Sequence, residues 1–274
     1  MSLSAILAFR LTTQDPQRLL RFYVGLGFSR EGTPTAISAE EIALLGLRGG
    51  GRRIALRLGE QQVDLDTFDE AGMPYPSDSN SADLWFQHFA LVTNDVAAQW
   101  ARAKVLGARP ISSDGAVTLP PSSGGVTAVK FRDPDGHPLE FLQFPDDVGR
   151  RQMRNSRLGI DHSAISVSDA RASQEFYETL GLSVRNPTRN QGSAQDGLDG
   201  LSNVEVDVVS MVPRNGIVHL ELLCYLRPNG RAGPPLSAND LAATRIVWAA
   251  DRNALIRDPD GHLHELLKER ADGS

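Results

Sequence analysis

The stretches FRDPDGHPLEFLQF (residues 131–144) and IRDPDGHLHELL (residues 256–267) repeat one turn and one strand within a single chain. In DPDG the proline presets φ and the glycine closes a hairpin, so each copy predicts a turn followed by a strand. We expect the shared histidine to belong to the turn rather than to the chemistry. Three residues further on stand Glu140 and Glu265, each among apolar neighbours. A carboxylate in that setting is costly unless it is paired or binds a metal.

A second repeat predicts three short amphipathic helices. The segments DPQRLLRFYVGLGF (15–28), DVAAQWARAKVLGA (95–108) and DARASQEFYETLGL (169–182) each begin with an aspartate and carry a glycine near the end. An aspartate at this place caps free backbone N–H groups, and the glycine suits a left-handed helix stop. Apolar residues recur at helical spacing between them.

These helices organise the chain into modules of a strand, a helix and about three further strands. The DPDGH copies are 125 residues apart but the FY-containing helices are 154 apart, so the second half is 154 − 125 = 29 residues shorter between these landmarks. A fourth module within 241–267 therefore lacks its helix. We predict an α+β fold with one half at 1–147 (modules 1 and 2), a charged linker at 148–157 and a second half at 158–270 (modules 3 and 4).

The motifs resemble those of the vicinal oxygen chelate superfamily over nearly the whole chain. Its signatures here are a histidine seven residues before the helix-capping aspartate, FYxxLG at the helix end and DPDGHxxE closing the second module. The superfamily includes glyoxalase I, extradiol dioxygenases and bleomycin-resistance proteins. The resemblance implies tandem βαβββ modules that form two curved mixed sheets, a glyoxalase-type fold. It does not specify the reaction, because one fold hosts many functions.

In that superfamily each module offers one ligand from its first strand and one from its last. The first position of each module lies seven residues before the aspartate that follows its first strand, and the second lies on its last strand. The four modules then have these pairs: Ala8 with Ala55, His88 with Glu140, His162 with Glu221, and Thr244 with Glu265. Pairing within the halves leaves two incomplete sets. Pairing module 2 with 3 and module 1 with 4 leaves one complete set and one vacant set.

We therefore predict a metal site at the junction of modules 2 and 3, with His88, Glu140, His162 and Glu221 as ligands. Two nitrogen and two oxygen ligands suit a divalent ion such as Zn²⁺, Ni²⁺ or Fe²⁺. A lone histidine on an apolar strand is most often structural, but these two recur at the same offset with an acidic partner. The partnerless Glu265 is then a structural carboxylate.

The resemblance implies a glyoxalase-type lyase or isomerase, with Glu140 or Glu221 as the general base that moves a proton through an enediolate. The alternatives are an Fe²⁺ extradiol dioxygenase and a non-catalytic small-molecule-binding protein without metal. Two loops, 115–125 and 185–197, are candidates to cover the site. His219 faces the same side as Glu221, and we expect it on the strand surface, with substrate contact as the alternative.

The composition limits the partners. The net charge is −6 with no basic stripe, so we expect a small-molecule substrate and neither nucleic acid nor membrane. The single cysteine, Cys224, lies in an apolar run and excludes an internal disulfide framework. We expect a cytoplasmic monomer or homodimer.

Overall fold

The computed structural model describes residues 1–145 and 159–269 as a mixed α+β fold. The helices are α1 (Pro16–Gly25), α2 (Ala39–Leu44), α3 (Val96–Val105), α5 (Ala170–Thr179), α6 (Ser193–Asp199) and the 3₁₀ helix η1 (Pro121–Ser123). The strands are β1 (Leu3–Thr12), β2 (Ser29–Ala36), β3 (Gly51–Leu58), β4 (Gln61–Phe68), β5 (Gln87–Val92), β6 (Arg109–Pro110), β7 (Val117–Thr118), β8 (Thr127–Arg132), β9 (Pro138–Gln143), β10 (Gly159–Ser166), β11 (Ser183–Gln191), β12 (Glu205–Val212), β13 (His219–Arg227), β14 (Arg245–Ala250), β15 (Ala254–Arg257) and β16 (Leu263–Lys268).

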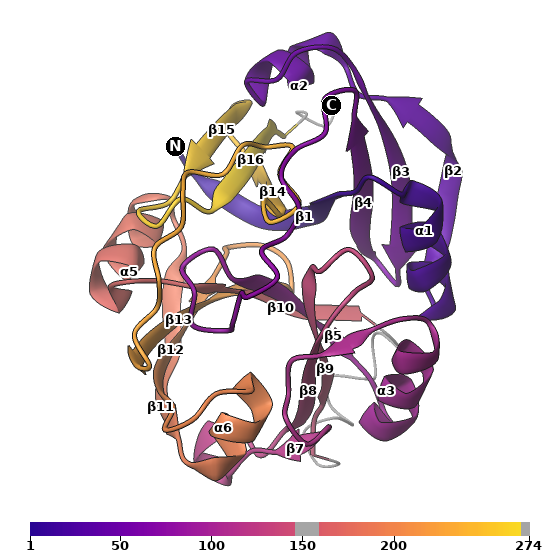
Figure 1. Cartoon of the computed structure of the whole chain (residues 1–274). Coiled ribbons are helices and arrows are strands. Elements are labelled where there is room, and N and C mark those ends of the chain that lie inside the picture. The colour runs from indigo at the N-terminus through magenta and orange to yellow at the C-terminus, as the bar shows by residue number, and fades with distance from the viewer. Residues whose placement is uncertain (146–158, 270–274) are drawn as a thin grey trace.

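The strands of the described residues form two mixed sheets, and each sheet combines strands from both halves of the sequence (Figure 1). One sheet has the order β15-β16-β14-β1-β4-β3-β2, and the other has the order β11-β12-β13-β10-β5-β9-β8-β6 with β7 beside β8. The first strands of modules 2 and 3, β5 and β10, pair antiparallel, as do β1 and β14 of modules 1 and 4. The predicted pairing of module 2 with 3 and of module 1 with 4 is confirmed.

The three predicted helices are present, and their caps follow the sequence signals. Asp15, Asp95 and Asp169 each accept a hydrogen bond from a backbone N–H of the first helical turn. The glycines that follow these helices adopt positive φ. In the fourth module only three residues separate β14 from β15, so the predicted loss of its helix is confirmed. The predicted linker at 148–157 lies outside the described residues, and the boundaries of the two halves remain a prediction.

Residues 185–197, predicted to be a loop, instead form most of strand β11 and the start of helix α6. β11 is an edge strand, which tolerates polar residues because its outer side faces water. Arg189 on β11 pairs with Asp207 of the neighbouring strand β12 at 2.7 Å. Helix α6 contacts β11 on one side and β7 and β8 on the other, so it bridges the two ends of the curved nine-stranded sheet (Figure 1).

The two repeated motifs meet in space within each half. The Tyr23 hydroxyl of helix α1 donates to Asp133 of the first DPDGH turn at 3.1 Å, and Tyr177 of helix α5 donates to Asp258 of the second at 3.0 Å. His137 Nδ1 lies 2.8 Å from Asp133, and His262 Nε2 lies 2.9 Å from the Ser166 carbonyl oxygen. Both DPDGH histidines therefore help to hold the turn in place.

A buried chain of polar groups fixes the orientation of His264. The Trp248 indole N–H can only donate, so His264 Nδ1 accepts it at 3.0 Å. His264 Nε2 then carries the hydrogen and donates to the Tyr177 hydroxyl at 2.8 Å, and that hydroxyl donates onward to Asp258. Burial lowers the pKa of His264 to about 4.

Among the described residues, no helix has the length and apolar character needed to cross a bilayer.

Candidate metal centre

Four adjacent strands in the middle of the nine-stranded sheet carry the four predicted ligands. In spatial order these are Glu221 on β13, His162 on β10, His88 on β5 and Glu140 on β9. Leu139 and Phe141 belong to the main hydrophobic core. Glu140, which lies between them on the strand, therefore points to the opposite face of the sheet. Parallel pairing places Ala90 opposite Glu140 and Ala164 opposite Glu221. In both modules the glutamate therefore lies opposite the residue two positions after the histidine.

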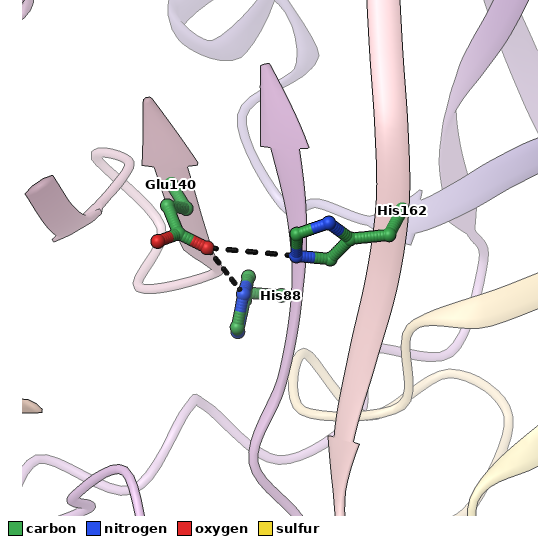
Figure 2. A group of neighbouring side chains, drawn as sticks. All are labelled: His88, Glu140 and His162. Atoms are coloured by element: carbon green, nitrogen blue, oxygen red, sulfur yellow. Dashed lines mark hydrogen bonds and ion pairs between the residues drawn. The ribbon is translucent and has the colours of Figure 1, made fainter. Parts of the chain in front are cut away.

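The donor atoms of His88, Glu140 and His162 all lie within 4.8 Å of one another (Figure 2). Glu140 Oε2 lies 3.0 Å from His88 Nε2 and 3.6 Å from His162 Nε2. His162 Nε2 also lies 3.6 Å from Glu221 Oε2. His88, Glu140 and His162 are buried, whereas the Glu221 side chain is 20% exposed. The structure thus brings three of the predicted residues into one cluster, and Glu221 lies beside His162 on the more accessible side.

The electrostatics of this cluster favour a cation at its centre. Burial alone would raise the pKa of both glutamates, but the nearby His162 and a hydrogen bond from His88 hold the pKa of Glu140 well below its usual range. The charge of His162 and a hydrogen bond from His219 lower the pKa of Glu221 to about 2. The buried Glu140 and the partly exposed Glu221 are therefore both ionised. Burial lowers the pKa of His162, but the charge of Glu221 and a hydrogen bond to Asp161 raise it by more. The pKa of His162 therefore lies well above its usual value.

The residues fit a divalent ion. A protonated His162 supplies one positive charge where the two carboxylates meet, and a metal ion at that point would displace its proton. Burial lowers the pKa of His88, which keeps this imidazole neutral as a ligand must be. The donor set of two imidazole nitrogens and two carboxylates is one that Zn²⁺, Ni²⁺ or Fe²⁺ accepts.

Asp161 supports His162 from outside the cluster, a contact that the sequence analysis missed. His162 Nδ1 lies 3.0 Å from Asp161 Oδ2, which directs Nε2 toward Glu140 and Glu221. Histidines that bind metals commonly donate the N–H of their second ring nitrogen to a carboxylate in this way. Successive residues of a regular strand face opposite sides, but the register of β10 shifts between Ile160 and Ser163, where the two side chains meet. The adjacent Asp-His pair was the available sequence signal.

Lys130 and His219 complete the surroundings. Lys130 on β8 stands opposite Glu140, and its Nζ lies 2.6 Å from Asp199 of helix α6. This buried ion pair ties α6 to the site, and the sequence analysis missed it. His219 lies on the same side as Glu221, as predicted, with Nε2 3.3 Å from Glu221 Oε1.

The seven-stranded sheet contains the corresponding positions without the corresponding residues. Its strand registers align with those of the other sheet. The counterparts of His88, Glu140, His162 and Glu221 are Ala8, Asp64, Arg245 and Glu265. The predictions of Ala55 and Thr244 for two of these positions were wrong. Ala55 lies on β3, but the last strand of module 1 is β4. Asp251 precedes strand β15 and not a helix, so the seven-residue spacing that applies before a helix cap does not hold for Thr244.

Arginines neutralise the carboxylates of this second set. Arg10 pairs with Asp64 at 3.2 Å and also with Glu265, while Arg245 pairs with Asp66 at 2.7 Å. The Arg245 side chain is fully buried in the place that corresponds to His162. The guanidinium groups supply the positive charge, so Glu265 has the structural role that was predicted for it.

The glyoxalase-type fold agrees with comparisons to solved structures. Glyoxalase I from Zea mays matches 97% of this chain and 92% of its own at 16% identity, with a TM-score of 0.59. A putative dioxygenase from Bacillus subtilis subsp. subtilis str. 168 matches 97% of this chain and 85% of its own at 14% identity, with a TM-score of 0.55. Identities this low establish the fold and not the reaction.

The sequence itself then gives the family. The model of the Glyoxalase/Bleomycin resistance protein/Dioxygenase superfamily matches residues 5–141, which is half of the 274 residues. The chain belongs to this superfamily, as the motifs had indicated. A comparison with curated proteins gives no match.

Proposed function

We propose that the protein is a metal-dependent lyase or isomerase of the glyoxalase type, acting on a small molecule with two neighbouring oxygens. The observation that carries this proposal is the cluster of His88, Glu140 and His162, with Glu221 beside His162, where modules 2 and 3 join. These residues would hold Zn²⁺, Ni²⁺ or Fe²⁺, which when bound acts as a Lewis acid toward the substrate oxygens.

Glu221 is the better placed of the two glutamates to move the proton. Glu140 Oε2 contacts both histidines and its side chain is only 7% exposed, so it has little freedom. The Glu221 side chain is 20% exposed, and within the described part of the chain its Oε1 accepts only long hydrogen bonds, from Ser210 at 3.4 Å and His219 at 3.3 Å. In this mechanism Glu221 takes a proton from the carbon next to the carbonyl and returns it to the neighbouring carbon.

The matched pair Glu221→Gln and Glu140→Gln tests this assignment. With the hemithioacetal of a 2-oxoaldehyde and a thiol as substrate, Glu221→Gln should lower kcat about 100-fold or more while KM changes little. Glu140→Gln should lower metal content first, and added metal should restore part of the activity. Equal kcat for wild type and Glu221→Gln at full metal content would refute the base assignment.

A second candidate is an Fe²⁺ extradiol dioxygenase. It is favoured by the close grouping of two histidines and one carboxylate, His88, His162 and Glu140, which is the ligand set of non-haem Fe²⁺ oxygenases. Oxygen uptake with catechols by the Fe²⁺-loaded protein would support this candidate. Turnover of the hemithioacetal without oxygen supports the isomerase. A non-catalytic binding protein predicts neither activity and no stoichiometric metal.

A further inference from the structure

The two halves of the chain carry the same loop packed against the same turn. Loops 80–86 and 237–243 correspond at an offset of 237 − 80 = 157 residues. In the first loop the backbone N–H of Asn80 donates to Asp83 at 2.8 Å, and in the second that of Ser237 donates to Asp240 at 2.7 Å. The DPDGH turns beneath them correspond at the offset of 125.

An arginine before each turn makes the same two contacts. Arg132 donates to the Gly136 carbonyl oxygen at 2.9 Å, and Arg257 donates to that of Gly261 at 3.1 Å. Each arginine also donates to the backbone of its covering loop, Arg132 to the carbonyl oxygen of Ser79 and Arg257 to that of Leu236. These acceptors are themselves 236 − 79 = 157 residues apart, so the two arginines occupy equivalent places.

In the first half a tyrosine ring fills the space above the turn. The guanidinium carbon of Arg132 lies 4.8 Å from the centre of the Tyr75 ring, and the ring of His137 lies 6.4 Å from it. Tyr75 packs so closely that a Cβ added to Gly136 would lie 2.9 Å from the Tyr75 Cβ. The arginine, the glycine and the histidine together form a seat for an aromatic ring.

In the second half the same seat has no ring from the described chain. The position that corresponds to Tyr75 is 75 + 157 = 232, an alanine. A Cβ added to Gly261 would meet no atom within 4 Å. Instead there is a pocket of about 330 Å³, lined by Arg257, Gly261 and His262 and walled by Trp85 and Leu236. Since an apolar cavity of about 150 Å³ holds benzene, this pocket has room for a substituted ring.

We propose that this pocket binds a small molecule bearing a phenol-type ring, which takes the place that Tyr75 occupies in the first half. The ring would lie over the Arg257 guanidinium as a cation–π pair, with Trp85 and Leu236 as its apolar walls. None of the four proposed metal ligands lines the pocket. This is therefore a second ligand site, and it does not depend on the proposed reaction.

The three tryptophans of the chain provide the readout. The probe is para-cresol, the tyrosine side chain as a free molecule, titrated into the ¹⁵N-labelled full-length protein. The Trp85 indole N–H signal should shift and saturate, whereas the signals of Trp100 and Trp248, which do not line the pocket, should stay in place. The saturated analogue 4-methylcyclohexanol should bind more weakly. Equal shifts of all three signals, or shifts that never saturate, overturn the proposal.

Three variants test the seat itself. Arg257→Met keeps the apolar stem and removes the charge, and it should weaken binding of para-cresol by about threefold to tenfold. Ala232→Tyr should fill the pocket and abolish binding. Tyr75→Ala should empty the equivalent seat in the first half and raise the stoichiometry from one to two. Wild-type affinity in both Arg257→Met and Ala232→Tyr would overturn the assignment, and the wild-type titration decides alone if a variant does not fold.

Discussion

Removing Asp161 should weaken metal binding without unfolding the protein. Asp161 holds His162 Nδ1 at 3.0 Å, and His162 is the residue whose Nε2 reaches both Glu140 and Glu221. In Asp161→Ala the imidazole can rotate and can place its hydrogen on Nε2, where it blocks coordination. Loss of such an outer contact typically lowers metal affinity about 10- to 100-fold, or about 1.4 to 2.7 kcal/mol. Because Asp161 is partly exposed, the fold should remain intact.

A competition titration against a chromophoric chelator of known Zn²⁺ affinity measures this loss. Asp161→Asn is the matched control, since its amide oxygen can still accept the ring N–H and only the charge is removed. Its affinity should fall between those of wild type and Asp161→Ala. A Zn²⁺ affinity for Asp161→Ala within twofold of wild type would refute the orienting role, provided that both proteins show the same thermal unfolding midpoint.

Three further predictions concern stability. His264 is less readily protonated when folded than when unfolded, where its pKa is about 6.5, so the unfolded state binds more protons between pH 6.5 and 4. As the pH drops through this window, the free energy of unfolding should therefore fall by about 3 kcal/mol more in wild type than in His264→Gln. The same pH dependence of the unfolding free energy in both proteins, measured by urea titration, would contradict this. Glu265→Gln, which breaks the buried pair with Arg10, should cost about 3 kcal/mol in urea unfolding; a loss below about 1 kcal/mol would count against it. Tyr177→Phe loses two hydrogen-bond partners and Tyr23→Phe one, so the first should cost about 1 kcal/mol more, and equal midpoints would contradict the assignment.

The fold was predictable because its signals are local and repeated. An aspartate cap, helical spacing and a closing glycine define each helix within about 14 residues, and DPDG defines a turn within four. Helix α6 has no such signal. Its N-cap position is Gly192, which offers no side-chain acceptor, and its stability comes from contacts with strands distant in the sequence. A polar segment of this kind is read as a loop from the sequence alone.

The proposed ligand positions could be located from the sequence in the nine-stranded sheet, whereas two of their counterparts in the seven-stranded sheet could not. His88 and His162 stand at a fixed distance from a helix cap, so the count transfers from one module to the next. On β4 the carboxylates Asp64 and Asp66 alternate with core residues, and this pattern alone resembles an exposed strand. Only the fold shows that arginines from distant strands neutralise them. The contacts of Asp161 and Lys130 depend on a strand irregularity and on α6, and neither can be read from spacing.

The metal content of protein purified without chelators tests the central claim most directly. We predict one divalent ion per chain in wild type and in Glu265→Gln, which alters the corresponding position of the other sheet, and less than about a tenth of an ion in the double variant His88→Ala/Glu221→Ala. Full retention of the ion by a folded double variant, or an ion lost from Glu265→Gln instead, would contradict the account.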